Sequence, residues 1–366
     1  MSPSVQFLHG GLLAPPLTMN KAVAPLGKLY LNVPAPIFRF IPFIRPSRMN
    51  RMLLVGCLLA CLAGEARFAL AAKRGVIEIR IVDSKTKEPL VARMHLKDQK
   101  GKPVKPPKSI FWHDHIVVDG SVKLELPSGN YNFEIERGLE YKTMYGKFFL
   151  EDDSADTKEI ALERFFDMTS EGWYSGDLDI QRSPGEMELL MKSDDLHMAP
   201  LTTWTTASIA AGEEPKSRET APIKFDSNRI YQLFAGRDER DGGGLLFFGL
   251  KDPLTIAKAS KEHPSGAQLL LQAKEGGAFC VAAQKTNAWD LPVWIATGQL
   301  DTVLLENLDL HREGFAQKEV GGRPRETARY PNPYGVGRWS QEIYYHLLNC
   351  GLRIPPAAGS APHGSA

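Results

Sequence analysis

Hydrophobic and polar residues alternate with a period of two along the chain from Gly75 to Glu163, and turn residues interrupt the alternation. Alternating runs cover residues 76–82, 91–97, 115–118, 122–127, 131–136, 145–150 and 159–162. Because successive side chains on a strand point to opposite faces, each run predicts a half-buried strand. Short strands at this spacing, separated by Gly, Pro and Asp turns, are typical of an antiparallel β-sandwich, which we predict over residues 75–163.

Beyond residue 163, apolar strand-like runs alternate with helical periods. Strands are predicted at 229–234, 245–250, 278–283 and 301–307, and helices at 266–277, 290–298 and 340–351. We expect the last helix to be capped by Ser340. The alternation predicts an α/β domain over residues 164–356, a parallel sheet or barrel with its site at the carboxyl ends of the strands. The predicted class is therefore multi-domain, β plus α/β, with a disordered tail at 357–366.

Residues 1–74 form an N-terminal extension that contains the pattern of a secretory signal peptide. Arg51 precedes an apolar run at 52–63, and the small residues that follow fit cleavage after Ala71. The run is shorter than the roughly 20 apolar residues that span a bilayer. The residues that end at Cys61 also resemble a lipobox, in which Cys61 would carry a lipid anchor. We expect an exported protein, periplasmic, secreted or lipid-anchored, with no membrane span.

Composition excludes some partners and chemistries. The net charge is +1 over 366 residues without a long basic block, which does not suggest nucleic acid as a partner. Behind the leader only Cys280 and Cys350 remain, and we interpret them as buried thiols rather than a disulfide. The glycines at 242–244 lack the helix and Lys of a phosphate loop, and no Gly-x-Ser-x-Gly elbow occurs.

The stretch at 172–204 carries the most informative polar pattern. Asp177, Asp179 and Gln181 are spaced two residues apart, so they point to one face if this segment is a strand. Metal-dependent hydrolases of the β/α-barrel type hold ligands in such rows at strand ends.

Five blocks of sequence occur in a characteristic order: GWYSGDLDIQR, DLHMAPLTTW, GGGLLFFGLKDPL, AWDLPVWIATGQLDTVLLENLDLHREG and YYHLLNCGLRIPPAAGSA. Together they resemble the CehA/McbA-type branch of the PHP (polymerase and histidinol phosphatase) superfamily. The phrase LELPSGNYNFEIERGLEY ahead of them resembles the carboxypeptidase-regulatory-like sandwich. The resemblance implies an exported, metal-dependent hydrolase with a PHP-like distorted β/α barrel. A metal-bound water would attack an ester, amide or phosphoester of a small-molecule or cell-surface substrate.

This chain departs from the family pattern at the metal motif. Where the superfamily has an H-x-H pair on its first strand, this sequence has Asp179 and Gln181. A carboxylate suits a hard cation such as magnesium or manganese, but a Gln amide is a weak ligand for these metals or for zinc. Late ligands and closing strands of the barrel are also expected to be absent, which would leave the barrel incomplete. We therefore expect reduced or lost hydrolase activity, or, as the alternative, a non-catalytic binding protein that uses the cleft or the sandwich.

The candidate site residues follow from this resemblance and from their positions. The metal candidates are Asp177, Asp179, His197 and Asp290, and the catalytic candidates are Glu306 and His311. His197 has the alternative of a partly buried structural histidine, and Asp290 that of a helix N-cap. Glu306 and His311 lie just past the strand at 301–307, together with Asn307 and Asp309.

Several other polar residues receive a structural interpretation. The formal H-x-H at His113-Asp114-His115 lies in the sandwich, where a structural role is favoured over a metal site. Asp194 and Asp195 are interpreted as solvated or capping residues. Lys285 is interpreted as a solvated surface residue, with an anionic substrate as the alternative partner.

Overall fold

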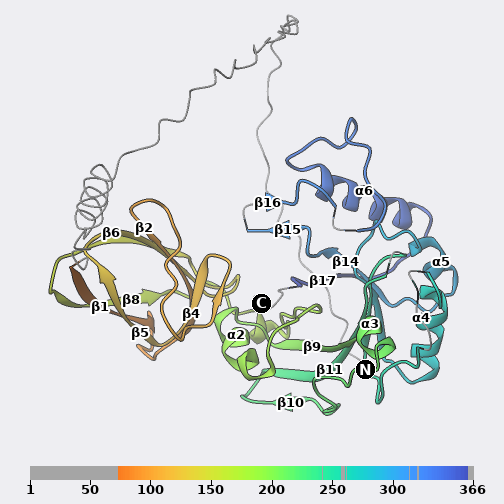
Figure 1. Ribbon diagram of the computed structural model, residues 1–366, viewed down its shortest axis with the longest axis horizontal. Coiled ribbons are helices and arrows are strands. Elements are labelled where there is room, and N and C mark those ends of the chain that lie inside the picture. The colour runs from red at the N-terminus through yellow and green to blue at the C-terminus, as the bar shows by residue number, and fades with distance from the viewer. Residues whose placement is uncertain are drawn as a thin grey trace, which may run out of the picture. The chain divides into compact units, whose positions relative to one another are not determined.

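A computed structural model describes residues 73–240, 242–256, 260, 262–312, 314–319 and 321–361 of the chain (Figure 1). The predicted signal peptide, including Cys61, lies outside the described residues. In the part that the structure describes, several β-sheets dominate and the helices are few. The sandwich region has a hydrophobic core of its own, distinct from the clusters of the region that follows it.

The first region contains the predicted strands. They are β1 (Arg74–Asp83), β2 (Val91–Asp98), β3 (Phe111–Trp112), β4 (His115–Asp119), β5 (Ser121–Pro127), β6 (Gly129–Glu136), β7 (Met144–Leu150) and β8 (Ala155–Leu162). A three-stranded sheet β5-β1-β8 and a five-stranded sheet β3-β4-β2-β6-β7 share one core, to which Ile79, Met94 and Ile135 contribute. This region is built of β-sheets, as predicted, but the predicted purely antiparallel form is wrong, because β1 pairs with β8 in parallel.

The second region is built on a seven-stranded sheet. Its strands are β9 (Met198–Thr205), β10 (Ile223–Lys224), β11 (Ile230–Asp238), β12 (Leu245–Phe248), β13 (Cys280–Ala283), β14 (Thr302–Glu306) and β17 (Pro356–Ala358). A separate two-stranded hairpin joins β15 (Leu310–His311) and β16 (Gly314–Phe315). The sheet order is β10-β11-β12-β13-β14-β17, with β9 also paired to β11. The predicted disordered tail begins too early, because Ala357 is buried in the edge strand β17.

Hydrogen bonds from residues 176–180 join the two edges of this sheet. On one side the Asp177 N–H donates to the Met198 carbonyl of β9 at 3.2 Å. On the other side the Leu178 N–H donates to the Ala358 carbonyl of β17 at 3.1 Å. Residues 176–180 therefore act as a further parallel strand between β9 and β17.

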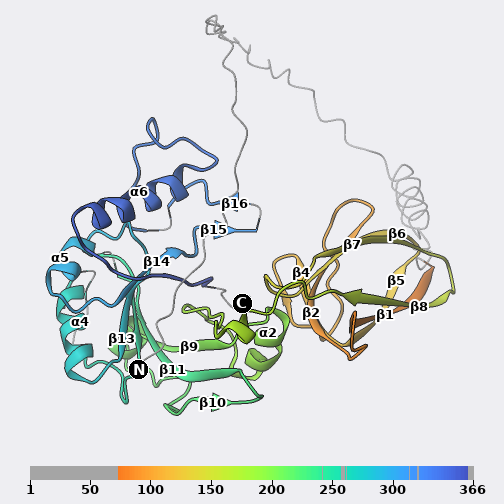
Figure 2. The ribbon, with the colours of Figure 1, turned by 180° about the vertical axis from the view of Figure 1, so that it is seen from behind.

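Helices flank the sheet. They are η1 (Met168–Glu171), η2 (Pro184–Glu186), α2 (Met187–Ser193), α3 (Thr206–Ala210), α4 (Gly266–Glu275), α5 (Leu291–Ala296) and α6 (Gly335–Asn349). Figure 2 shows α4, α5 and α6 beside the strands β13 and β14, where Trp294 and Tyr344 join the core. Ser340 does not cap α6, which begins at Gly335, because the Ser340 hydroxyl lies 2.5 Å from the Thr286 hydroxyl in a tertiary contact.

The loop after β6 packs tightly against the turn after α2. Gly138 adopts a left-handed φ of 53°, and a Cβ at this position would lie 2.5 Å from the Asp194 carbonyl oxygen. Only glycine combines that φ with so close an approach. Gly138 therefore sets the contact between the sandwich and the second region.

Among the residues that the structure describes, no helix is both long enough and apolar enough to pass through a membrane. Both described cysteines are free thiols. The prediction that both are buried is wrong for Cys350, which is exposed at the end of α6, and Cys280 is half-buried.

Candidate functional site

The carboxyl ends of six parallel strands meet at one rim of the second region. Residues 176–180, β9, β11, β13, β14 and β17 all run in the same direction, whereas β12 and the short β10 run antiparallel to their neighbours. Polar residues gather at or near this rim: Asp179, Gln181, Arg237, Gln284, Lys285, Glu306 and Ser360. The sheet thus brings together residues as far apart in sequence as Asp179 and Ser360, as the sequence predicted for its strand ends.

Asp179 lies among nitrogen donors at this rim. Its side chain is 1% exposed, and its Oδ2 accepts a hydrogen bond from the Gln284 Nε2 at 2.7 Å. Its Oδ1 accepts from the Gln181 Nε2 at 3.1 Å and faces the Arg237 Nη1 at 3.5 Å. Both oxygens of the carboxylate are therefore occupied by N–H groups of the protein itself.

This donor set does not fit a divalent metal ion at Asp179. A cation needs several oxygen or nitrogen lone pairs around it. Around Asp179, two Gln side chains offer amide hydrogens, and the buried Arg237 already supplies a positive charge. A metal ion at this position would have to displace these donors and approach a guanidinium.

The Asp177 carboxylate also accepts hydrogen bonds from the protein itself. One carboxylate oxygen accepts from the backbone N–H groups of Asp179 and Ser360, each at 3.0 Å, and the other accepts from the Ser360 hydroxyl. Burial raises the pKa of Asp177, and the charge of Asp179 adds to this effect. The chain segment after β17 thus holds a carboxylate that the sequence predicted as a metal ligand.

The predicted catalytic pair is described only in part. Glu306 is exposed at the end of β14, and its backbone carbonyl accepts from the Gly359 N–H at 2.9 Å. His311 belongs to β15, but its side chain lies outside the described residues. Beside them, the buried Lys285 and Asp309 form an ion pair at 2.8 Å, so the interpretation of Lys285 as a solvated residue is wrong. Both make contacts that keep them within the protein interior.

A cavity of about 960 Å³ opens beside this rim. Its charged and aromatic lining residues are Arg237, Asp238, Glu239, Arg240, Glu262, Lys285, Trp289, Asp290 and Trp294. The Asp290 side chain makes no N-cap hydrogen bond, although Asp290 stands at the start of α5. Burial and the nearby Glu262 raise the pKa of Asp290. Asp290 lines the cavity with Arg237 and Gln284, whereas Asp177 and Asp179 are not among its lining residues.

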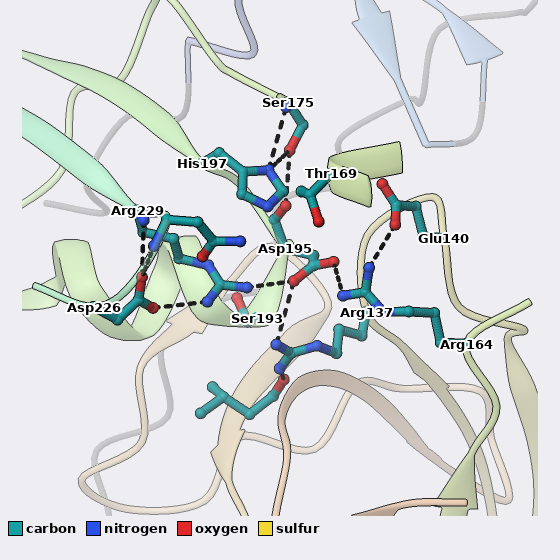
Figure 3. A network of polar contacts seen from close by, with 12 residues as sticks. Arg137, Glu140, Arg164, Thr169, Ser175, Ser193, Asp195, His197, Asp226 and Arg229 are labelled. Carbon is teal, nitrogen blue, oxygen red and sulfur yellow. Dashed lines mark hydrogen bonds and ion pairs between the residues drawn. The ribbon is translucent and has the colours of Figure 1, made fainter. Parts of the chain in front are cut away.

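His197 lies in a different network from the predicted metal ligands (Figure 3). Its Nδ1 accepts from the Ser175 N–H at 3.3 Å and lies 2.9 Å from the Ser175 hydroxyl. The same hydroxyl donates to the Asp195 carbonyl at 2.7 Å. Burial is the main cause that lowers the pKa of His197, so the ring is neutral near pH 7. These contacts agree with the structural alternative for this residue.

Asp195 is a buried charge rather than a solvated residue, so its interpretation from sequence is wrong. Its side chain is 3% exposed and faces three guanidinium groups (Figure 3). A guanidinium nitrogen lies 3.3 Å from the carboxylate in Arg137, which follows β6, and 2.5 Å from it in Arg164, which follows β8. The third partner is Arg229, which directly precedes β11. One carboxylate therefore ties the sandwich to the second region.

A second polar cluster lies on the sandwich. His95 Nδ1 and His115 Nδ1 lie 3.1 and 3.3 Å from the Asp114 Oδ1. His95 Nε2 lies 2.9 Å from the Glu136 carboxylate, and Arg312 reaches the cluster from the β15–β16 hairpin. The hydrogen bond from His95 is the main cause that lowers the pKa of Glu136 to about 2. Burial lowers the pKa of His115 to about 4, so this ring is neutral at pH 7.

Sequence reasoning missed Arg237 and Gln284 at the rim and His95 and Glu136 on the sandwich. Arg237 lies in β11 and Gln284 directly follows β13, so their positions at strand ends were a usable sign. His95 and Glu136 occupy polar positions of alternating strands. Such positions indicate which face of the sheet a side chain lies on, but not which residue it contacts.

No protein-family model matches this chain, and no curated protein matches it. Some solved structures are similar to parts of it. The Bacillus anthracis TIE protein shares 18% identity over 30% of this chain and 19% of its own length, with a TM-score of 0.21. The Streptococcus agalactiae minor pilin GBS52 shares 22% identity over 26% of this chain and 46% of its own, with a TM-score of 0.22. The Bacillus cereus major pilin subunit BcpA shares 20% over 25% of this chain and 30% of its own, at 0.20. At these TM-scores the similarity supports no functional conclusion.

Proposed function

We propose that this chain is an exported, PHP-like hydrolase homologue that has lost metal-dependent catalysis. Its cleft at the strand ends would bind a small-molecule or cell-surface ligand without cleaving it. The order of the five sequence blocks supports the family, and the leader supports export. The parallel strands with polar residues at their carboxyl ends agree with a barrel of this kind.

The observation that carries the proposal is the environment of Asp179. In place of a first metal ligand, the chain has a carboxylate whose oxygens accept from Gln284 and Gln181 and face Arg237. The guanidinium provides the positive charge that a metal would otherwise provide, which stabilises a buried carboxylate without any ion. A hydrolytic metal is therefore not part of this site, and no reaction step passes through one.

The cleft keeps the properties of a binding site. Trp289 is 54% exposed, and the guanidinium of Arg323 lies 5.8 Å from its ring centroid. Next to this ring, the cavity wall carries Asp290, whose carboxylate makes no helix-cap bond. An exposed aromatic ring beside this carboxylate suits a polar ligand with an apolar face, such as a sugar.

The test combines metal content, hydrolysis and ligand binding on the purified mature protein. We expect no bound metal ion whose retention requires Asp179. We also expect no hydrolysis of nitrophenyl esters, nitrophenyl phosphodiesters or amide substrates above a protein-free control. Hydrolysis that disappears in an Asp179→Asn variant would contradict the proposal. A thermal-shift screen with cell-wall saccharides tests the cleft, and Trp289→Ala should remove any shift while the matched exposed-aromatic control Tyr145→Ala should retain it.

A further inference from the structure

The outer face of the five-stranded sandwich sheet is polar because of strand alternation. In β2, Met94 points into the sandwich core, so His95 points to the opposite face. Met94 pairs with Ile116 of the antiparallel β4, which sets His95 directly across from His115. Their ring centroids are 4.9 Å apart. Two imidazoles from neighbouring strands thus share one face.

A tight turn adds a carboxylate to this pair. Trp112 of β3 pairs with His115 of β4, so only His113 and Asp114 connect the two strands. His113 takes the left-handed φ of 51° that the turn requires, and its side chain is exposed. Asp114 folds back over the pair instead, so that one of its oxygens faces the Nδ1 atoms of His95 and His115.

The ligand atoms of this cluster converge. The His95 ring lies between two carboxylates, with its Nε2 2.9 Å from Glu136 and its Nδ1 3.1 Å from the Asp114 Oδ1. In the neutral ring with its proton on Nε2, the Nδ1 lone pair can bind a metal ion placed between His95 and Asp114. Arg312 faces the same atoms, with its Nη1 at 3.2 Å from His95 Nδ1 and 3.4 Å from the Asp114 Oδ2.

Two of the three ligand-atom spacings match those around a tetrahedral metal ion. Metal–ligand distances of about 2.0–2.1 Å place neighbouring ligand atoms about 3.3 Å apart. The two nitrogen–oxygen distances here are 3.1 and 3.3 Å, and all three ligand atoms lie within 4.8 Å of one another. Two imidazoles and one carboxylate form a donor set suited to zinc.

We propose that His95, Asp114 and His115 form a zinc-class metal site on the sandwich, separate from the strand-end cleft. Glu136 fixes the tautomer and orientation of His95, as carboxylates commonly do behind metal-bound histidines. Arg312 and the metal ion compete for the same lone pairs. Metal binding therefore releases Arg312, which otherwise also pairs with Glu134 of β6. The site links metal occupancy to the contact between the sandwich and the β15–β16 hairpin.

Zinc titration by calorimetry on the chelator-treated full chain tests this proposal. We expect one zinc ion to bind per chain, with cobalt as a spectroscopic substitute that shows the intense visible bands of tetrahedral coordination. His115→Ala and Asp114→Asn should each weaken binding by at least about tenfold. His113→Asn, in the same turn but outside the cluster, should leave affinity unchanged.

Arg312→Ala gives an effect of the opposite sign. Removal of the competing guanidinium should strengthen zinc binding, whereas a purely structural role of the cluster would leave zinc binding absent in every variant. Circular dichroism and thermal melts establish that each variant is folded. Absence of zinc binding in the native chain, equal affinity in the native and His115→Ala proteins, or weaker binding by Arg312→Ala would each overturn the proposal.

Discussion

Replacement of Asp195 by asparagine removes one negative charge and changes almost no volume. The native carboxylate is 3% exposed and pairs with Arg137, Arg164 and Arg229. An asparagine can accept one or two of these hydrogen bonds, but it cannot balance the guanidinium charges. Because Arg137 belongs to the sandwich and Arg229 to the second region, the loss affects the contact between the two.

The expected cost follows from the burial of the three guanidinium groups. Breaking a buried ion pair by removing one partner costs about 3–5 kcal/mol. The side chains of Arg229 and Arg137 are 12% and 8% exposed, but that of Arg164 is 25% exposed, so water offsets part of its loss. We therefore expect a loss of about 3 kcal/mol in the free energy of unfolding. At 2–4 °C for each kcal/mol, the Tm falls by roughly 6–12 °C.

Thermal and urea denaturation of the purified protein measure this change. Asp226→Asn is the matched control, because Asp226 pairs only with Arg229 among the described ion pairs and its side chain is 26% exposed. We expect the control to lose less than about 1 kcal/mol. If Asp195→Asn is as stable as the control, the buried charge network does not hold the two regions together.

The remaining predictions concern single residues. Gly138→Ala should lower the Tm by several degrees in thermal melts, because its Cβ would meet the Asp194 carbonyl at 2.5 Å, and unchanged stability would refute the close contact. The lowered pKa of His197 means that the unfolded chain takes up a proton near its ordinary value of 6.5 while the folded chain does not. Stability should therefore fall between pH 7 and pH 5, and the fall should be shallower in His197→Asn. Burial raises the pKa of the Cys280 thiol to about 12, so peptide mapping at pH 8 should find iodoacetamide on the exposed Cys350 well before Cys280.

The architecture was largely predictable because it rests on the period of apolar positions. Alternation identified the sandwich strands to within a few residues, and apolar runs identified β11, β12, β13 and β14. The parallel pairing of β1 with β8 was not predictable, because it joins residues about 80 positions apart and leaves no local pattern. Ser340 shows the same limit, since its hydroxyl contacts Thr286 instead of capping its helix.

The chemistry of the sites was less predictable. The row Asp177, Asp179 and Gln181 was correctly located at a strand end, but its partners come from distant strands. Arg237 and Gln284 have no sequence pattern that reveals which carboxylate they contact. The His113-Asp114-His115 motif likewise gained meaning only when the sheet placed His95 beside it.

The central claim, that the strand-end site holds no hydrolytic metal, is tested most directly by metal binding in a His115→Ala background. This variant removes the proposed zinc site of the sandwich and leaves Asp177 and Asp179 intact. After incubation with manganese or zinc and removal of unbound ions, metal analysis is predicted to find well under one ion per chain. One retained ion per chain that disappears on addition of Asp179→Asn would contradict the account.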